Sequence, residues 1–279
     1  MGFVRASRRG PFRPKLGQHF LKSGDVVERI LRAVGAGSGD AVVEIGPGRG
    51  ALTAPLLAAG IHVLAFELDD TLASRLEREH EGSSLVVHRG DALDADFGAI
   101  LGEASATVPL PLVGNLPYGA ATPMIRAFVR RADLFSRLVV MVQLEVADRL
   151  VAGPRDKAYG FLTLDVGAHA GGRKLFDVPR TSFEPPPKVI SSVVELIPHP
   201  PRPGTEGALA VASAGFTTRR KTLVNSLAAL WGREKALETV QGLDLLPTVR
   251  AEELPLETFY ALSERLGPRR GVDRAATIP

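Results

Sequence analysis

Four consecutive residues after an apolar run have the types and the order needed to hold a planar amine: Asn115, Leu116, Pro117 and Tyr118. Proline has no N–H and biases the residue before it to an extended conformation, so the Leu116 carbonyl is held in a fixed direction. This carbonyl and the Asn115 side-chain oxygen can accept both hydrogens of an exocyclic amine such as adenine N6 and favour its charge-developing form during attack. Tyr118 offers an aromatic face for the base. Taken alone, the tetrad could also be a proline turn with a packed tyrosine.

A glycine-rich segment after another apolar run predicts a cofactor site. In "VVEIGPGRGA", Gly46 and Gly48 satisfy a loose dinucleotide fingerprint, and Glu67 lies about 20 residues further on, where a ribose-binding acid is expected. Glu44 would oppose the pyrophosphate of a dinucleotide but suits the sulfonium and ammonium cations of S-adenosylmethionine. The charges therefore favour S-adenosylmethionine, with a plain β-turn-α joint as the alternative.

Asp91 follows a third apolar run and could accept the exocyclic amine of a cofactor adenine. On its own it could equally be a turn or helix-cap residue. Parallel strands deliver their carboxyl ends to one edge of a sheet, so all these loops would open on the same side.

Strand-like and helix-like patterns alternate through the first two-thirds of the chain, which predicts a doubly wound, mostly parallel α/β sheet. The apolar runs are 41–46, 61–68, 84–91, 111–115 and 137–145, and 189–197 closes the region. We expect domains at these bounds: a basic arm over 1–24, a methyltransferase domain over 25–198, a Pro/Gly-rich linker over 199–207 and an all-helical domain over 208–279.

Composition narrows the chemistry. With 279 residues and 45% hydrophobic content the chain can bury a substantial core. The absence of cysteine excludes disulfides, thiolate metal sites and cysteine nucleophiles, and no metal is expected. No segment has the apolar length of a membrane span or a signal peptide, so we expect a cytoplasmic protein.

The positive charge is concentrated in two places. The net charge of the chain is +3, yet residues 1–24 alone carry +6, so the remainder is acidic. Such an arm is either solvated or neutralises nucleic-acid phosphates. A second cluster is expected to begin a helix, where the macrodipole disfavours cations, which suggests an external anion such as RNA phosphate. The cations expected to contact RNA are Arg8, Arg9, Arg13, Lys15, Arg219, Arg220 and Lys221.

With these motifs together, the sequence closely resembles the bacterial 16S ribosomal RNA adenine N6,N6-dimethyltransferases. The resemblance covers nearly the whole chain and rests on these segments: 15–21, 43–53, 66–69, 90–93, 114–118, 143–160, 183–196 and 216–227. It implies a Rossmann-like class I methyltransferase sheet with a small C-terminal helical domain that docks on the small ribosomal subunit. It also implies transfer from S-adenosylmethionine to two adjacent adenines of 16S rRNA, late in subunit assembly, by a protein expected to be a monomer.

The resemblance also assigns residues to the two ligands. The cofactor pocket would be lined by His19, Leu21, Gly46, Gly48, Glu67, Asp91 and Asn115. Asn115, Leu116 and Tyr118 would hold the target adenine, and Phe183 would supply the second face of an aromatic sandwich. His19 and Gly119 stand where many members have asparagine. Two alternatives remain at this point: a large-subunit adenine methyltransferase of the macrolide-resistance type, and a mainly non-catalytic assembly factor.

Overall fold

The computed structural model describes residues 19–103, 107–218 and 220–268. Its contacts divide the chain into two compact units. The sheet unit contains the described residues up to Leu144, together with Lys174–Leu196. The helical unit contains Glu145–Arg173 and the described residues from Ile197 onward.

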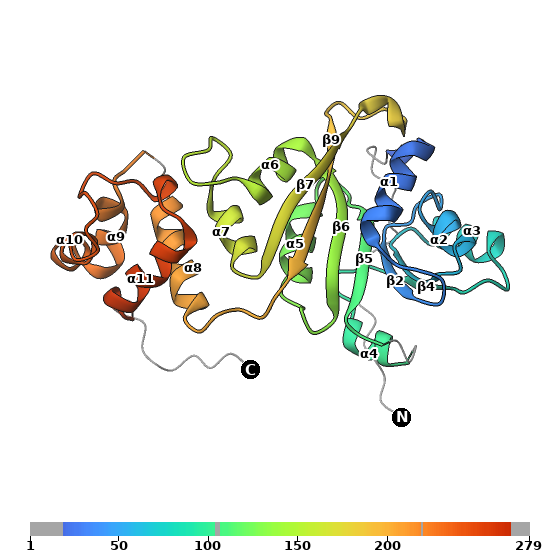
Figure 1. Cartoon of the computed structure of the whole chain (residues 1–279), viewed down its shortest axis with the longest axis horizontal. Coiled ribbons are helices and arrows are strands. Elements are labelled where there is room, and N and C mark those ends of the chain that lie inside the picture. Colours follow the sequence, from blue (N-terminus) through green and yellow to red (C-terminus); the bar gives the residue numbers. More distant parts are fainter. Residues whose placement is uncertain (1–18, 104–106, 219, 269–279) are drawn as a thin grey trace. The chain divides into compact units, whose positions relative to one another are not determined.

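A seven-stranded sheet with the order β4-β3-β2-β5-β6-β9-β7 organises the sheet unit (Figure 1). The strands are β2 (Ala41–Ile45), β3 (His62–Glu67), β4 (Leu85–Arg89), β5 (Leu110–Asn115), β6 (Phe135–Gln143), β7 (Ala170–Val178) and β9 (Ser191–Pro198). The first five pair in parallel, whereas β9 pairs antiparallel with β6. The chain moves outward from β2 to β4 and then returns to β5, so the topological switch point lies between β2 and β5. Ligands bind beyond the carboxyl ends of strands at such a point.

Gly114 allows β2 and β5 to approach closely at this switch point. Ile45 pairs with Gly114, and a Cβ added at Gly114 would lie 2.5 Å from the Ile45 carbonyl oxygen. No larger residue fits there without a backbone shift. The loops after β2 and β5, which carry the glycines and Asn115, are thereby held side by side.

The helices of the sheet unit follow the apolar periodicity of the sequence. They are α1 (Gly24–Val34), α2 (Thr53–Ala58), α3 (Asp70–Glu79), α4 (Phe97–Glu103) and α5 (Ala121–Phe128). In α1 the buried residues Val26, Ile30 and Val34 repeat every four positions and therefore share one face. The helix ends at Gly35, whose φ of 69° is left-handed and suits a C-terminal cap.

A second, two-stranded sheet joins distant segments of the chain. β1 (Phe20–Leu21) pairs antiparallel with β8 (Phe183–Glu184), which follows the short 3-10 helix η1 (Arg180–Ser182). Leu21 and Phe183 belong to the same buried apolar cluster as residues of α1 and the central strands. The residues just before α1 are thus attached to the loop that precedes β9.

The helical unit has its own apolar core. Its elements are α6 (Leu144–Val151), α7 (Phe161–Gly167), α8 (Thr205–Phe216), α9 (Leu223–Trp231), α10 (Arg233–Gln241), η2 (Ala251–Glu253) and α11 (Leu256–Leu266). Trp231 and Phe259 are buried in this core together with Tyr159 from the segment between α6 and α7. The Tyr159 hydroxyl donates to the Leu254 carbonyl (2.8 Å), and burial raises the pKa of Tyr159 to about 12.

The predicted α/β class is confirmed, while the unit boundaries differ from the predicted domains. Glu145–Arg173 groups with the C-terminal helices because Tyr159 and Leu164 belong to their core. The predicted linker is also shorter, since α8 already begins at Thr205, whose hydroxyl bonds with that of Tyr260 (2.6 Å). Among the described residues, no helix has the length and apolar character needed to cross a membrane.

Candidate active site

The glycine loop after β2 is built around left-handed backbone conformations. Gly46 and Gly48 have φ values of 65° and 59°, which residues with a Cβ rarely adopt. The Gly48 N–H donates to Oε2 of Glu67 (3.0 Å), and the Asp69 N–H donates to Oε1 of the same carboxylate (2.9 Å). Glu67 therefore spans from the end of β3 to the loop after β2, and each of its oxygens keeps acceptor capacity for a ligand hydroxyl.

The neighbouring carboxylates of Glu44 and Glu67 make this part of the sheet unit favourable for a positively charged ligand. Glu44 is 1% exposed, and its Oε2 accepts a hydrogen bond from the Thr53 hydroxyl (2.7 Å). Burial, opposed by this hydrogen bond and supported by the charge of Glu67, raises the pKa of Glu44 to about 7. Burial also raises the pKa of Glu67. A cation bound beside this pair would favour the ionised forms.

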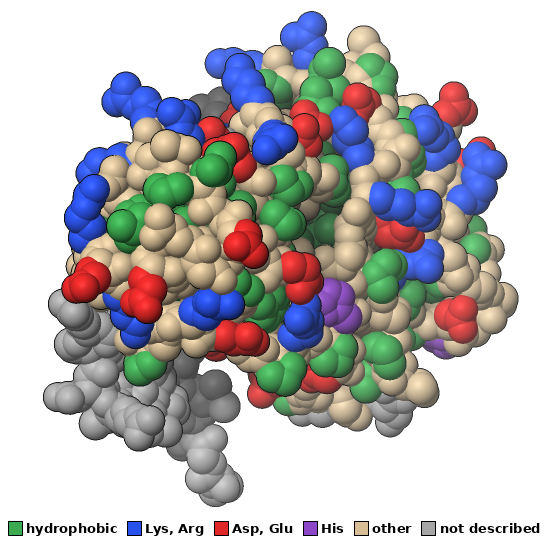
Figure 2. Space-filling view, turned by 60° about the vertical axis from the view of Figure 1, so that its left-hand side comes forward, with side chains coloured by type: hydrophobic (Ala, Val, Ile, Leu, Met, Phe, Trp, Pro, Cys, Tyr) green, Lys and Arg blue, Asp and Glu red, His purple; other side chains and the backbone are tan. Residues whose placement is uncertain are grey.

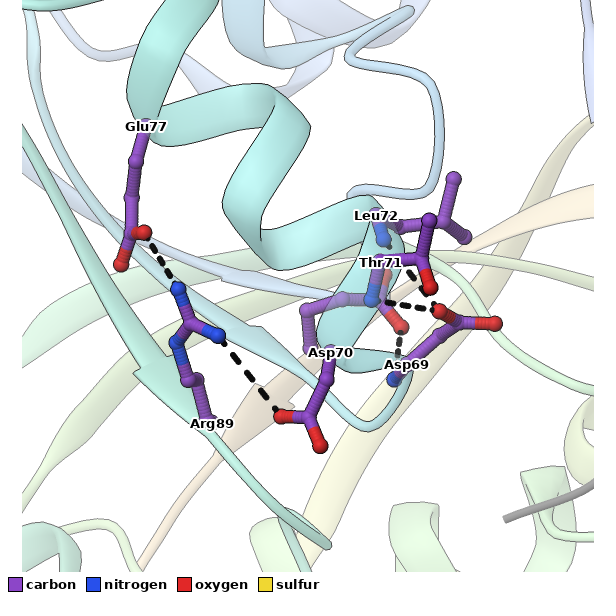
Figure 3. Close-up of polar contacts among 7 residues, drawn as sticks. Asp69, Asp70, Thr71, Leu72, Glu77 and Arg89 are labelled. Atoms are coloured by element: carbon purple, nitrogen blue, oxygen red, sulfur yellow. Dashed lines mark hydrogen bonds and ion pairs between the residues drawn. The ribbon is translucent and has the colours of Figure 1, made fainter. Parts of the chain in front are cut away.

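The start of α3 and the end of β4 are fixed by charged side chains (Figure 3). Asp69 caps α3 by accepting from the Thr71 N–H at 2.8 Å and the Leu72 N–H at 3.2 Å. Arg89, the last residue of β4, forms ion pairs with Glu77 and Asp70 of α3 (Figure 3). These contacts hold the two loops that carry Glu67 and Asp91.

Asp91 forms a local turn in addition to any ligand contact. Its Oδ1 accepts from the Leu93 N–H (2.9 Å), which is the turn role that the sequence also allowed. Its position after β4 puts it beyond the carboxyl end of a parallel strand, as Gly46 is after β2.

Asn115 ends β5, and its side-chain amide is oriented by the backbone. Its Nδ2 donates to the His19 carbonyl oxygen (3.0 Å). Only the NH₂ end of an amide can face a carbonyl in this way, so Oδ1 is the end left to accept a ligand hydrogen. The next residue, Leu116, is 1% exposed, and its N–H donates to the Met141 carbonyl (3.1 Å), which anchors the peptide before Pro117.

Tyr118 is half-buried beside two residues that the sequence alone did not connect with it. Its hydroxyl is 3.0 Å from that of Ser191 at the start of β9, and its ring centroid is 5.7 Å from that of His19. His19 Nδ1 in turn lies 2.7 Å from the Pro185 carbonyl oxygen. The structure thus brings His19, Asn115 and Tyr118 together.

The side chain of Phe183 is more deeply buried than those of Asn115 and Tyr118, with which it was predicted to hold the target adenine. Its side chain is 1% exposed and packs in the apolar core with Leu21, which faces it across the β1–β8 pair. The ring face predicted to stack on the target base is covered in this conformation. Its stacking role remains a prediction, and it requires the ring to become exposed.

The predicted RNA-binding cations are only partly within the described residues. Arg8, Arg9, Arg13, Lys15 and Arg219 lie outside them. Arg220 and Lys221 are exposed in the turn between α8 and α9, with Thr222 capping α9.

Arg220 and Lys221 lie just before α9 rather than inside its first turn, since Lys221 directly precedes the N-cap Thr222. They also follow the C-terminal end of α8 at Phe216, where a macrodipole favours positive charge. Contact of these cations with an external anion stays a prediction. Figure 2 shows Lys and Arg side chains interspersed with Asp and Glu on the face in view.

Three contributors to the site were not found by sequence reasoning. They are the His19 main-chain carbonyl, Ser191 and Thr53, whose partners are 96, 73 and 9 residues away, respectively. The long separations leave no local pattern for the first two. Thr53 could have been found from its position in the first turn after the glycine loop.

Comparison with known proteins identifies the family. The model for ribosomal RNA adenine dimethylase matches residues 10–267. The chain belongs to this family. It is 43% identical to the ribosomal RNA small subunit methyltransferase A of Bordetella petrii, over 91% of this chain and 95% of the relative. It is 44% identical to the Paramagnetospirillum magneticum protein of the same name, over 92% of this chain and 91% of the relative.

Solved structures agree with this assignment. The crystal structure of a dimethyladenosine transferase from Plasmodium falciparum aligns with a TM-score of 0.73 at 27% identity, covering 88% of this chain and 96% of that one. The 23S rRNA methyltransferase ErmE aligns with a TM-score of 0.67 at 24% identity, covering 88% and 99%, which supports the shared fold. The fold is that of a class I methyltransferase.

Proposed function

We propose that this member of the family is an S-adenosylmethionine-dependent methyltransferase that dimethylates N6 of two adjacent adenines near the 3′ end of 16S rRNA. The proposal is carried by the Asn115 amide, whose NH₂ is held by the His19 carbonyl so that its oxygen is the free acceptor at the switch point of the sheet. Family membership and curated relatives named for the small subunit support the same activity. They do not favour the large-subunit alternative.

The residues present fit S-adenosylmethionine as the methyl donor. Glu67 has unused acceptor capacity for ribose hydroxyls, and the buried Glu44 and Glu67 favour a cationic ligand over a pyrophosphate. We assign Gly46, Gly48, Leu21, His19 and Asp91 to the same pocket. When bound, the cofactor supplies an electrophilic methyl group on a sulfonium sulfur.

The chain's own part in the reaction is to position and polarise the target amine. Oδ1 of Asn115 and the Leu116 carbonyl accept its two hydrogens, which favours the pyramidal nitrogen that develops positive charge during attack. Tyr118 stacks on the base after it has left its helix, at about 1–3 kcal/mol per stacked base. The nitrogen loses its proton only after it has become cationic, so no side chain with a shifted pKa is needed as a general base.

The proposal also covers the binding partner of the protein, its oligomeric state and its place in the cell. We propose that the substrate is 16S rRNA within the small ribosomal subunit, that the protein acts as a monomer in the cytoplasm, and that the helical unit and the basic arm (residues 1–24) contact the RNA. The charge of the arm and the exposed Arg220 and Lys221 support RNA contact.

The decisive experiment is methyl transfer from labelled S-adenosylmethionine to small subunits that lack these methyl groups, followed by mapping of the modified nucleotides. We expect label in N6,N6-dimethyladenine at two adjacent adenines of 16S rRNA. In a parallel reaction with large subunits, label in 23S rRNA together with none in the small subunits would support the large-subunit alternative. Binding to subunits without any transfer would support the assembly-factor alternative.

A further inference from the structure

Residues 19–22, called the strap here, join three parts of the active site that are distant in the sequence. Phe20 and Leu21 pair with β8, and the Lys22 N–H donates to the Ser182 carbonyl (2.8 Å). Leu21 is 7% exposed. The strap is therefore fixed at its C-terminal end by backbone pairing and burial, immediately before α1 begins.

Phe20 lies over the glycine loop. A Cβ built on Gly48 would approach Cε1 of the Phe20 ring to 3.2 Å, so the ring lies close to the backbone of that loop. The Arg49 guanidinium lies over the ring with its carbon 4.2 Å from the centroid, within the range of a cation–π contact. The Phe20 ring thus lies close to the Gly48 backbone and beneath the Arg49 guanidinium.

The residue before Phe20 supplies the contact that orients the catalytic amide. The His19 carbonyl oxygen accepts the Asn115 Nδ2–H bond at 3.0 Å. This carbonyl belongs to the peptide that links His19 to Phe20, so the position of the Phe20 backbone sets where the carbonyl points. Loss of the contact would let the amide rotate and present its NH₂ group, a donor, to the target amine.

We propose that Phe20 is a positioning residue for methyl transfer, held by Arg49, and that it acts through the His19 carbonyl on the Asn115 amide. The inference rests on the proposed function, because it takes Oδ1 of Asn115 as an acceptor for the target amine. It adds a physical link between the cofactor loop and the catalytic loop. The strap lies near the C-terminal end of the basic arm (residues 1–24).

The first test compares single-turnover rates of methyl transfer to unmethylated small subunits, with cofactor and subunits both saturating so that binding losses do not contribute. We expect Phe20→Ala to lower the rate about three- to tenfold, as for the loss of one well-made hydrogen bond, with an unchanged KM for the subunit. Phe20→Tyr keeps the ring and should retain the rate.

Arg49→Ala tests the same idea on an exposed side chain, where folding is not at risk. A matched control exists in the sheet unit, because the Arg29 guanidinium lies 3.6 Å from the Phe176 ring centroid in an equivalent pair outside the site. Arg49→Ala should slow the reaction about twofold or more, and Arg29→Ala should not. Equal rates for these two variants would overturn the inference that Arg49 holds the Phe20 ring in place.

A double-mutant cycle with Asn115→Asp tests the route of the effect. The aspartate keeps an acceptor oxygen but has no N–H for the His19 carbonyl, so the contact is already lost. We expect Phe20→Ala to cost less than about twofold in the Asn115→Asp background. The same fold-loss in both backgrounds would overturn the inference. Full activity of Asn115→Ala would instead overturn the acceptor mechanism itself.

Discussion

Replacement of Glu44 by glutamine should change the pH dependence of folding stability. Glu44 is fully enclosed, and its pKa is raised from 4.5 to about 7, with burial as the largest cause. A raised carboxyl pKa means that the folded protein binds the proton more tightly than the unfolded chain does. The corresponding stability is fully present below pH 4.5 and is lost as the pH rises through 7. Glutamine keeps the shape and an oxygen for the Thr53 hydroxyl but does not ionise in this range.

The size of the effect follows from the difference between the two pKa values. Each unit corresponds to 1.36 kcal/mol, so a raised value of about 7 against 4.5 implies that ionising Glu44 costs the folded state about 3 kcal/mol. Between pH 5 and pH 8 the free energy of unfolding of the wild-type protein should fall by most of this amount through Glu44 alone. The Glu44→Gln variant should lack this contribution.

The assay is urea denaturation of both proteins at pH 5 and pH 8. The difference in unfolding free energy, variant minus wild type, should be about 2–3 kcal/mol larger at pH 8 than at pH 5. Glu79→Gln provides a surface control, since its ion pair with Arg75 is exposed and should contribute less than about 1 kcal/mol at either pH. The same difference in unfolding free energy between Glu44→Gln and wild type at both pH values would refute the assignment of Glu44 as a buried carboxyl with a raised pKa.

Three further outcomes are expected. Asn115→Ala should lower the rate of methyl transfer about 10²- to 10³-fold while binding to small subunits is retained, and an unchanged rate in a single-turnover assay would contradict the acceptor role. Phe183→Ala should lower the free energy of unfolding by about 3–5 kcal/mol because the ring is buried, and a change below about 1 kcal/mol in thermal or urea denaturation would show that the ring packs elsewhere. Deletion of residues 1–13, which removes four arginines, should reduce the slope of log affinity against log salt by up to about 3, and a slope unaltered in binding titrations would show that the arm does not contact phosphate.

Much of the sheet unit could be predicted because its signals are local. Short β-branched runs alternating with helical patterns predicted the parallel strands, and polar residues after those runs marked the edge of the sheet. Glu67 and Asn115 accordingly end β3 and β5, two parallel strands of the sheet.

Elements whose identity depends on distant partners were not predicted. β7 contains Gly171, Gly172, Arg173 and Lys174, which suggest a turn, and it forms a strand at one end of the sheet. The grouping of Glu145–Arg173 with the helical unit depends on Tyr159 reaching the core formed by α8–α11. Neither fact has a signature within a short window of sequence.

The active site shows the same contrast between features with a local sequence signal and features that depend on distant contacts. Side-chain types and spacing predicted ligand contacts for Asn115 and Tyr118, but the group that orients the Asn115 amide is the His19 main-chain carbonyl, which carries no sequence signature. The predicted stacking face of Phe183 also depended on tertiary packing, and in the structure that packing covers the ring. Residue types predicted which groups could bind the ligands, whereas the orientation of those groups depends on the fold.

The most direct test of the mechanism is an experimental structure of the protein bound to an unmethylated small subunit and a non-reactive analogue of S-adenosylmethionine. The account predicts that Oδ1 of Asn115 and the Leu116 carbonyl oxygen both lie within hydrogen-bond distance of N6 of one target adenine, with Nδ2 still on the His19 carbonyl. Those two oxygens facing away from the adenine while its N6 is aligned with the bound analogue would contradict it.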